Sequence, residues 1–453
     1  MDFTHLIKKD AKPSRLGIIG ATRGYGYTLL AQLRRVPLLS LRVISSRHED
    51  ECRAVLEELG WAPECIVACQ TAEQIASAPE DAVLIVSDYR LVPECGITSL
   101  VECTGNTAVS TDAALAALNK GINVYMVSKE TDSICGPLLN QVAEKNGAVY
   151  ALVNGDQPRN LIDLYSWAKF VGLDVIAAGK ASEYDFIYDT ETAGFSYLDY
   201  KSEIPALRDC WRYAGLETLK ARRALLEEHT DVISADLCEM NLVSNVTGFT
   251  PAAPTMNYPI AKISELAEIF VPVEDGGILT KTGVVDVFFH LHGPDEASFS
   301  GGEFVIVRCD NEKVWKLLAE KGHVVSRSGK YACLYEPWHY MGVETTASII
   351  LGDQLGIGTH PECRQVSVLV GAAKQDIPAG TQLKVEGHHH MIDGLRPELV
   401  ELSLAPGDVA PFYLLNGAVV KEDIRAGEYV SLKAVELRGQ ETLGHYLEGL
   451  KID

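Results

Sequence analysis

The stretch Arg15-Leu-Gly-Ile-Ile-Gly-Ala-Thr-Arg-Gly-Tyr-Gly-Tyr-Thr-Leu-Leu-Ala-Gln-Leu33 decides the fold of the N-terminal part of the chain. Residues 16–19 form a short apolar run, which is typical of a buried parallel strand. Gly20, Gly24 and Gly26 follow this run, and the apolar residues after them recur at helical spacing. A strand, a glycine-rich turn and a helix in this order favour a site for the phosphates of a dinucleotide.

The glycines have the spacing G-x-x-x-G-x-G, which is looser than the usual G-x-G-x-x-G. Gly20 permits a sharp turn, while Gly24 and Gly26 let backbone N–H groups and the helix N-terminus approach a pyrophosphate. The alternative interpretation is a glycine-rich turn that binds nothing. If the loop does bind a dinucleotide, its other contacts come from Thr22, Arg23 and Tyr25.

The second predicted strand, residues 41–45, decides which dinucleotide fits. Sites that prefer NAD place an Asp or Glu about 20 residues past the glycines, on the ribose 2′-hydroxyl. Here Ser46 and Arg47 occupy that position, and hydroxyls with a guanidinium suit a 2′-phosphate. Arg23 adds a second positive charge. We therefore predict NADP(H), with NAD as the alternative cofactor; the competing interpretation is that both arginines are ordinary surface residues.

Residues 14–155 read as alternating strands and helices, which predicts a Rossmann-type, doubly wound parallel sheet. Ligands of such sheets lie beyond the carboxyl ends of the strands. One strand end continues into small polar residues that we expect near the nicotinamide ribose: Cys103, Thr104, Gly105 and Asn106. Another strand ends at Ser128 and Lys129, where the lysine is placed to contact a substrate oxygen; the alternative is a solvated loop lysine. The following helix is predicted over 136–146.

The remaining sequence predicts two further domains after the dinucleotide-binding domain of residues 1–155. Residues 156–341 hold strands and helices without regular alternation, including helices over 207–219 and 221–229, and predict an α+β substrate and dimerisation domain. We expect the helix 342–355 to pack back on the first domain, with Glu344 pointing toward the cofactor. Residues 360–453 lack helical periodicity, repeat the pattern D-I-x-A-G, and predict a small β module.

Proton transfer needs a group whose pKa suits the task, and a buried lysine is one such group. Lys129 and Lys180 are the two candidates, and Asp156 is predicted to orient a lysine or a substrate hydroxyl. His339 is a further candidate acid or base, with a packing role beside Trp338 as the alternative.

No metal ligand is predicted from the sequence. Glu130 and Asp132 would suit a divalent ion only in a reductoisomerisation, and a solvated acidic turn is the favoured interpretation. His388, His389 and His390 are adjacent, and neighbouring residues of a strand point to opposite faces, so they rarely bind one ion. The 11 cysteines are scattered without a C-x-x-C pair, which argues against a zinc site or a disulfide framework and favours the cytoplasm.

The formal net charge of −22 disfavours nucleic acid and anionic membranes as partners, because both need a basic surface. The N-terminal residues are polar and mixed, and no apolar run reaches the ~18 residues that span a membrane. We expect a cytoplasmic protein with a small-molecule substrate.

Several of these stretches resemble one known family. The chain is similar to homoserine-dehydrogenase-like oxidoreductases with a C-terminal SAF domain, the group that includes deoxyxylulose-phosphate reductoisomerase-like enzymes. The resemblance implies an NAD(P)-binding domain, a dimerising substrate domain, a β-clip module, a homodimer or homotetramer, and a proton-transfer role for Lys129. The stretches that carry it are Val101-Glu-Cys-Thr-Gly-Asn106, Gly155-Asp-Gln-Pro158, Ala178-Gly-Lys180, Gly329-Lys-Tyr331, Tyr335-Glu-Pro-Trp-His339 and the D-I-x-A-G repeats.

The sequence thus predicts an NADP(H)-dependent oxidoreductase that acts on a small hydroxy-carbonyl or sugar-phosphate-like substrate, in a dehydrogenase or reductoisomerase-like reaction. Two alternatives stay open. One is homoserine dehydrogenase itself, and the other is a protein without turnover that binds NADP as a sensor or assembly factor.

Overall fold

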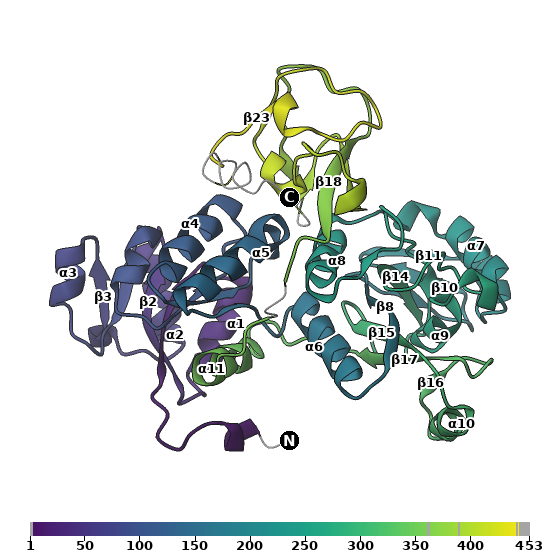
Figure 1. Cartoon of the computed structure of the whole chain (residues 1–453), viewed down its shortest axis with the longest axis horizontal. Helices are drawn as coiled ribbons and strands as arrows, with labels where there is room; N and C mark the ends of the chain where they lie inside the picture. The colour runs from purple at the N-terminus through teal and green to yellow at the C-terminus, as the bar shows by residue number, and fades with distance from the viewer. Residues whose placement is uncertain (1–2, 360–362, 388–389, 441–442, 444–453) are drawn as a thin grey trace. The chain divides into compact units, whose positions relative to one another are not determined.

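The computed structural model describes residues 3–359, 363–387, 390–440 and 443. The chain divides into two compact units (Figure 1). Unit 1 comprises residues 1–159, 340–363 and 437–453, and unit 2 comprises residues 160–339 and 364–436. Each unit is therefore built from segments that are far apart in the sequence.

Unit 1 contains a sheet of seven parallel strands in the order β3-β4-β2-β1-β5-β6-β7. The order reverses between β1 and β5, which makes the carboxyl ends of these two strands the topological switch point. The predicted Rossmann-type sheet is confirmed. Its strands are β1 (Ser14–Ile19), β2 (Leu39–Ser45), β3 (Ile66–Cys69), β4 (Val83–Val86), β5 (Ser99–Glu102), β6 (Asn123–Met126) and β7 (Tyr150–Leu152).

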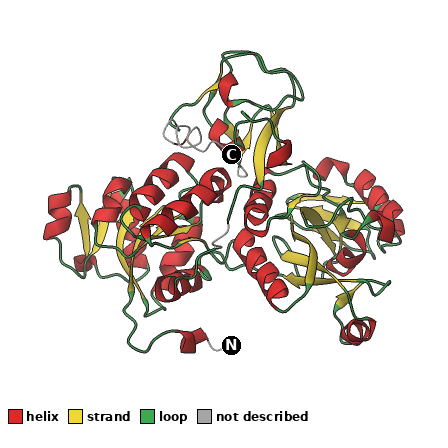
Figure 2. Ribbon diagram, in the orientation of Figure 1, coloured by secondary structure: helices red, strands yellow, loops and turns green. Residues whose placement is uncertain are grey.

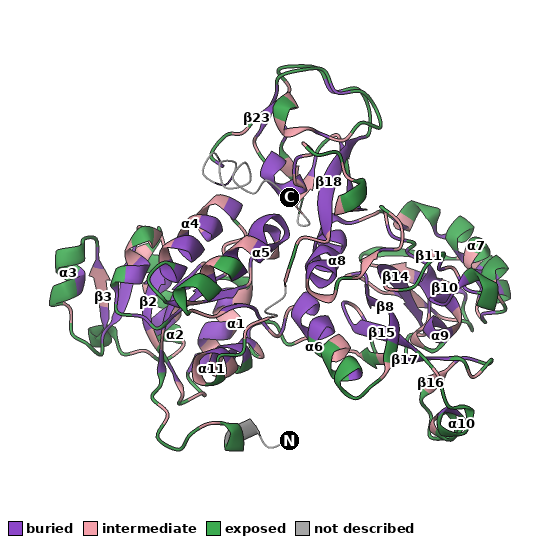
Figure 3. Cartoon of the chain, viewed as in Figure 1, coloured by how far each residue is buried: buried purple, intermediate pink, exposed green. Residues whose placement is uncertain are grey.

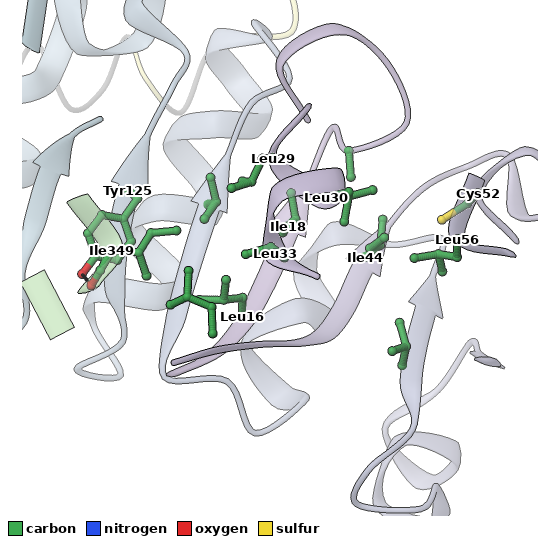
Figure 4. Close-up of a cluster of buried hydrophobic side chains, with 14 of the residues drawn as sticks. Leu16, Ile18, Leu29, Leu30, Leu33, Ile44, Cys52, Leu56, Tyr125 and Ile349 are labelled. Carbon is green, nitrogen blue, oxygen red and sulfur yellow. Dashed lines mark hydrogen bonds between the residues drawn. The ribbon is translucent and has the colours of Figure 1, made fainter. Parts of the chain in front are cut away.

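Helices lie against this sheet, as Figure 2 shows by colour. They are α1 (Gly24–Leu33), α2 (Glu49–Glu58), α3 (Ala72–Ser77), α4 (Thr107–Leu118), α5 (Lys129–Asn146) and α11 (Thr345–Leu355). Helix α1 buries Leu29, Leu30 and Leu33 against Leu16 and Ile18 of β1 (Figure 4). Because Leu33 lies four residues after Leu29 and three after Leu30, the three leucines share one face of the helix.

Helix α11 joins unit 1 although it lies almost 200 residues after β7. The Asp353 carboxylate accepts hydrogen bonds from the Tyr125 hydroxyl at 2.6 Å and the Ser99 hydroxyl at 2.6 Å. Ile349 belongs to the hydrophobic core of the unit (Figure 4). A Cβ atom at Gly352 would lie 2.1 Å from the Tyr125 hydroxyl, so glycine allows the helix to approach the sheet.

Unit 2 is built on a mixed sheet in the order β11-β10-β9-β14-β8-β15-β17-β16, with β12 and β13 paired to β14. The central strands are buried on both faces (Figure 3). The strands are β8 (Asp174–Ala181), β9 (Phe186–Tyr188), β10 (Gly194–Tyr197), β11 (Tyr200–Glu203), β12 (Thr250–Pro251), β13 (Ile260–Ala261), β14 (Val284–His292), β15 (Glu303–Arg308), β16 (Val324–Val325) and β17 (Tyr331–Glu336).

Five helices follow α5 before α11: α6 (Gln157–Phe170), α7 (Leu216–Leu225), α8 (Ser234–Thr247), α9 (Leu266–Ile269) and α10 (Glu312–Glu320). After α11 the chain forms small antiparallel pairs, in agreement with the predicted β module. They are β18 (Ser367–Ala373) with β21 (Leu395–Glu401), β19 (Val385–Glu386) with β20 (Met391–Ile392), and β22 (Val419–Val420) with β23 (Val435–Glu436). Among the described residues, no helix has the length and apolar character to cross a membrane.

Three predicted helices have the wrong bounds. Helix α5 begins at Lys129, not at residue 136, because Pro137 is accommodated inside the helix rather than starting it. In place of the helices expected over 207–219 and 221–229, the structure has one α-helix, α7, between the 3-10 segments Pro205–Cys210 and Glu227–His229. Helix α8, which was not predicted, follows and is buried along most of its length. A helix buried all round lacks the amphipathic pattern by which a surface helix is predicted.

Candidate functional site: a glycine loop and a buried charged row

Two glycines of the loop in unit 1 pack closely against neighbouring backbone. Gly20 has φ +85°, and a Cβ atom there would lie 2.6 Å from the carbonyl oxygen of Cys103. A Cβ atom at Gly26 would lie 2.4 Å from the carbonyl oxygen of Gly20. Side chains are thus excluded where β1 turns into α1, at the switch point of the sheet.

The N-terminus of α1 starts from Arg23 in an extended conformation, and no side chain of this residue caps the helix. The first N–H groups of a helix have no partners within it, and together with the helix dipole they attract anions. The Arg23 guanidinium forms an exposed ion pair with Glu51, with 2.9 Å between Nε and Oε1. Gly24 is exposed and Thr22 half-buried beside it.

Tyr25, predicted as a cofactor contact, is tied to α11 and to the loop after β7. Its hydroxyl lies 2.6 Å from the Thr345 hydroxyl and donates to the Asn154 carbonyl at 3.1 Å. Burial, followed by the nearby charge of Asp156, raises the pKa of this phenol well above its usual value. The side chain of Tyr25 therefore joins three segments of unit 1, and its backbone remains in the glycine loop.

The position after β2 carries no acidic side chain. The Ser46 hydroxyl accepts a hydrogen bond from the backbone N–H of His48 at 3.1 Å, which shapes the turn into α2. Arg47 is exposed and makes no ion pair with the described residues. Of the two arginines predicted for a 2′-phosphate, Arg47 is the one not already paired.

A buried carboxylate organises the loop after β5. Glu102, at the end of that strand, accepts hydrogen bonds from the Thr104 backbone N–H at 3.0 Å and the Thr104 hydroxyl at 2.6 Å. Burial raises the pKa of Glu102, and these hydrogen bonds oppose that shift. Asn106 caps α4 by accepting from the N–H of Val109 at 3.1 Å. Burial and the charge of Glu102 raise the pKa of the Cys103 thiol well above its usual value.

The loops after β5 and β6 are connected at the same edge of the sheet. The N–H of Gly105 donates to the Ser128 hydroxyl at 2.8 Å. Lys129 follows directly in the first turn of α5 and is half-buried. The structure therefore brings together Cys103, Thr104, Gly105, Asn106, Ser128 and Lys129, as the sequence predicted for residues that follow neighbouring parallel strands.

Asp132, one turn further along α5, belongs to the interior. Its carboxylate accepts a hydrogen bond from the Tyr150 hydroxyl at 2.6 Å. Burial raises its pKa to about 6 in spite of that bond. The expectation of a solvated acidic turn at Glu130 and Asp132 is wrong, because both residues lie on the buried face of a helix.

Asp156 and Glu344 lie close to one another within unit 1. Both are half-buried. A Cβ atom at Gly155, the neighbour of Asp156, would lie 2.6 Å from the Tyr340 carbonyl oxygen and 3.4 Å from the Glu344 Cβ. The segment before α11 therefore approaches the loop after β7 within unit 1.

In unit 2, Lys180 is fully buried and bound by two carboxylates of α8. Its Nζ lies 2.9 Å from Asp236 Oδ1 and also contacts Glu239. Asp236 additionally accepts hydrogen bonds from the Ser182 hydroxyl at 2.7 Å and the Tyr258 hydroxyl at 3.0 Å. Because Lys180 is fully buried and paired with both carboxylates, it holds Asp236 and Glu239 in position.

The strand register extends this cluster into a row across three strands. Glu303 of β15 lies opposite Lys180 of β8 on one side and opposite Glu336 of β17 on the other. Both carboxylate oxygens of Glu303 are buried without a hydrogen-bond partner among the described residues. Burial, together with the charge of Glu336, raises the pKa of Glu303 well above its usual value.

His339 is half-buried and follows β17 in unit 2. It comes directly after Trp338, which lines a groove of about 530 Å³ together with Tyr335 and Pro337. His388 and His389 lie outside the described residues. The sequence reasoning missed Asp236, Glu239, Glu303 and Glu336. Among these four residues, only Asp236 and Glu239 are close in the sequence, with the i,i+3 spacing that places two carboxylates on one face of a helix. No helix was predicted there, so this spacing was not recognised.

The residues of the glycine loop fit a dinucleotide. Two positions exclude a Cβ atom, an uncapped helix N-terminus begins there, and the loop lies at the switch point where such sheets bind ligands.

Comparison with protein-family models gives a match to one part of the chain. Residues 155–345 match the model described as "Oxidoreductase DRL, catalytic domain". No curated protein matches the chain.

Similar solved structures include DOX-P reductoisomerase in complex with NADPH, fosmidomycin and magnesium (15% identity, 51% of this chain and 58% of that chain, TM-score 0.30). A 1-deoxy-D-xylulose 5-phosphate reductoisomerase from Zymomonas mobilis in complex with NADPH has 14% identity over 38% of this chain and 46% of that chain, with a TM-score of 0.29. A probable dehydrogenase from Thermotoga maritima has 12% identity over 76% and 90%, with a TM-score of 0.35. The chain spans about half the length of the reductoisomerases it matches. The family match confirms the predicted enzyme class: the chain is an oxidoreductase whose segment 155–345 resembles the DRL catalytic domain.

Proposed function

We propose that the chain is an NADP(H)-dependent oxidoreductase that transfers hydride to or from a small hydroxy-carbonyl or sugar-phosphate-like substrate. The observation that carries this proposal is the glycine loop at the switch point, where a Cβ atom at Gly20 or Gly26 would collide with backbone. The match of residues 155–345 to an oxidoreductase catalytic domain supports turnover rather than sensing.

The preference for NADP(H) rests on charge. Arg47 is exposed at the end of β2, where an NAD-selective site needs an acidic residue. A guanidinium can hold a 2′-phosphate through two hydrogen bonds. Arg23 would contribute less, because Glu51 already holds it.

Residues of the chain would bind the cofactor, orient its reactive ring and transfer the proton of the reaction. The N–H groups at the start of α1 would hold the pyrophosphate, and the loop of residues 103–106 would orient the nicotinamide ribose. When bound, the nicotinamide would supply or accept the hydride, according to the direction of the reaction. Lys129 would donate or accept the proton of the reacting oxygen, because it begins α5 directly after Ser128, whose hydroxyl holds that loop. Asp156 would orient the substrate or the lysine.

In the catalytic-domain segment, Lys180 would act as a positioning residue rather than as the group that contacts substrate. It is fully buried and held by Asp236 and Glu239. Glu303 lies next to it in the sheet, and burial together with the charge of Glu336 raises the pKa of this carboxyl, which favours its protonated form.

The substrate proposal follows the resemblance to the reductoisomerase-like group, with homoserine as the alternative substrate. The same resemblance supports two further proposals, a homo-oligomer and a SAF character for the C-terminal β module. A role for His339 as an acid or base is proposed from its side chain alone.

The test has two parts. NADPH and NADH are titrated into the purified chain by following nucleotide fluorescence, and we expect tighter binding of NADPH. The oxidation of NADPH is then followed with 1-deoxy-D-xylulose 5-phosphate, aspartate semialdehyde and a panel of small hydroxy-carbonyls. Turnover with one of these supports the proposal. Tight NADPH binding with no turnover favours the sensor, and tighter binding of NADH overturns the cofactor assignment.

A further inference from the structure

Three side chains that can bind metal lie together in unit 2. His290 and His292 occupy alternate positions of β14, so both point to the same face of the sheet. Asp185 precedes β9, whose first residue, Phe186, pairs with Leu291 between the two histidines. The strand register therefore brings the carboxylate of Asp185 next to both imidazoles.

The donor atoms are close and almost fully buried. His290 Nδ1 lies 2.9 Å from Asp185 Oδ1, and His292 Nε2 lies 3.4 Å from Asp185 Oδ2. One ligand atom from each of the three residues lies within 4.8 Å of the others. The exposed fractions of the side chains are 4% for His290, 5% for His292 and 8% for Asp185. The two imidazole rings stack with 5.0 Å between their centres.

The hydrogen bonds around these residues leave one acceptor unexplained. His292 Nδ1 lies 2.6 Å from the carbonyl oxygen of Gly293, and since a carbonyl only accepts, this nitrogen carries the proton. In the neutral ring, Nε2 then has a lone pair, and this atom is buried with no hydrogen bond among the described residues. This atom lies 3.4 Å from Asp185 Oδ2, so in the neutral ring a nitrogen lone pair faces a carboxylate oxygen.

The distance between these two atoms suits a metal ion. Ligands at about 2.0–2.1 Å around a tetrahedral Zn²⁺ lie ~3.4 Å apart. A hydrogen bond from a protonated His292 to Asp185 would be shorter, at roughly 2.7–3.2 Å. The contacts outside the cluster are also those that orient metal ligands: a backbone carbonyl fixes the tautomer of His292, and the Ser298 hydroxyl donates to the Asp185 carboxylate.

We propose that Asp185, His290 and His292 bind one divalent transition-metal ion of the Zn²⁺ class. Two imidazoles and one carboxylate are a ligand set for zinc or iron(II), and they disfavour Mg²⁺, which selects oxygen ligands. Binding requires His290 to carry its proton on Nε2, so its hydrogen bond to Asp185 is replaced by bonds from both residues to the ion. Three protein ligands leave a fourth position for water or a ligand.

This cluster differs from the charged row around Lys180. Its neighbours are aromatic: the His290 ring contacts Phe288 and Phe299, and Phe299 in turn contacts Tyr335. An ion bound here would link β14 to the turn before β9. Its ligands include no residue assigned above to hydride transfer, so the binding of the ion would not depend on the identity of the substrate.

The experiment measures binding directly, with the full chain stripped by a chelator and then titrated with Co²⁺ and Zn²⁺. We expect one Co²⁺ per chain, with visible absorption bands of a low-coordinate nitrogen and oxygen site, displaced by Zn²⁺ but not by excess Mg²⁺. His292→Gln and Asp185→Asn should weaken Co²⁺ binding by at least about 100-fold, because each removes a ligand. The exposed His323, replaced in His323→Ala, is the matched control and should leave binding unchanged.

Far-UV circular dichroism of each variant shows whether it is folded. If a variant does not fold, the stoichiometry and spectrum of the unmodified chain still decide. Absence of Co²⁺ binding by the unmodified chain, octahedral all-oxygen spectra, or unchanged binding in folded His292→Gln would each overturn the proposal and leave a protonated His292 bridging to Asp185.

Discussion

Gly20 and Cys103 approach one another so closely that a Cβ atom at Gly20 would lie 2.6 Å from the Cys103 carbonyl oxygen. Gly20 also has φ +85°, which side chains disfavour. Gly20→Ala should therefore destabilise unit 1 by about 1–3 kcal/mol and weaken NADPH binding. Thermal unfolding and nucleotide titration measure the two effects.

The control for this change is Gly407→Ala. Nothing lies within 4 Å of a Cβ atom at Gly407. Its stability should change by no more than about 0.5 kcal/mol. Equal stability and equal NADPH affinity in the two variants would contradict the account of the glycine loop.

Arg47 should determine the preference for NADPH, because it is the exposed guanidinium at the end of β2. Arg47→Ala should weaken NADPH binding by about 10-fold, the equivalent of one lost charge-assisted contact, and leave NADH binding nearly unchanged. Arg35→Ala, at the far end of α1, is the control. Glu51→Gln should have the opposite effect, since it releases Arg23 from its ion pair.

Lys129 should carry the proton transfer. Lys129→Ala should lower kcat by about 10²–10⁴-fold, the range for loss of a general acid or base, while the Kd for NADPH stays the same. Lys145→Ala, in the last turn of the same helix, is the matched control and should retain full activity. A Lys129→Ala enzyme with normal kcat would remove this residue from the mechanism.

Lys180→Met should be strongly destabilising, by about 3–5 kcal/mol, because it leaves the carboxylates of Asp236 and Glu239 buried without their cation. Adding Glu239→Gln to this variant should restore part of the loss. Lys220→Met, which breaks an exposed pair with Glu217, should cost no more than about 1 kcal/mol. Chemical unfolding measures all of these, and a stable Lys180→Met chain with low kcat would instead make Lys180 a catalytic group.

Asp132 should make stability depend on pH. Its pKa is about 6 in the folded chain because of burial, against 3.8 in the unfolded chain. Its favourable contribution is therefore complete below pH 3.8 and is lost as the pH rises through 6. The shift amounts to about 3 kcal/mol.

Asp132→Asn should consequently be more stable than the unmodified chain at pH 8, with the difference shrinking toward pH 4. The amide can still accept the hydrogen bond of the Tyr150 hydroxyl. Asp50→Asn, at an exposed position of α2, should show no such pH dependence. Unfolding curves across this pH range provide the measurement, and a pH-independent difference would mean that Asp132 stays charged in the folded chain.

Most strands and helices of unit 1 could be predicted because each of them is marked by a pattern within a short stretch of sequence. Apolar runs of four to six residues, glycines after them and helical periodicity each mark one element, and parallel order then places the loops of 20–26, 103–106 and 128–129 on one edge of the sheet. The short edge strand β3 was missed, since four residues give little pattern. The start of α5 was misplaced because Gly136-Pro137 looks like a helix beginning.

The charged row of unit 2 had no such signal. Lys180, Glu303 and Glu336 come from three strands separated by long stretches of chain, and only the antiparallel register of β15 with β8 and β17 makes them neighbours. Asp236 and Glu239 lie on a helix buried all round, so amphipathic periodicity did not reveal it. Such tertiary pairings follow from packing that a single sequence does not display.

The dependence of unit 1 on α11 has a consequence for how the protein is made. While the ribosome has released only the first 159 residues, the hydroxyls of Tyr125 and Ser99 lack their partner Asp353, and the core position filled by Ile349 is vacant. The core of the N-terminal sheet therefore stays incomplete until some 190 further residues, up to α11, have been translated. During that interval its uncovered apolar surface would be a natural target for chaperones, and a gene fragment cut at the unit boundary would encode an aggregation-prone polypeptide.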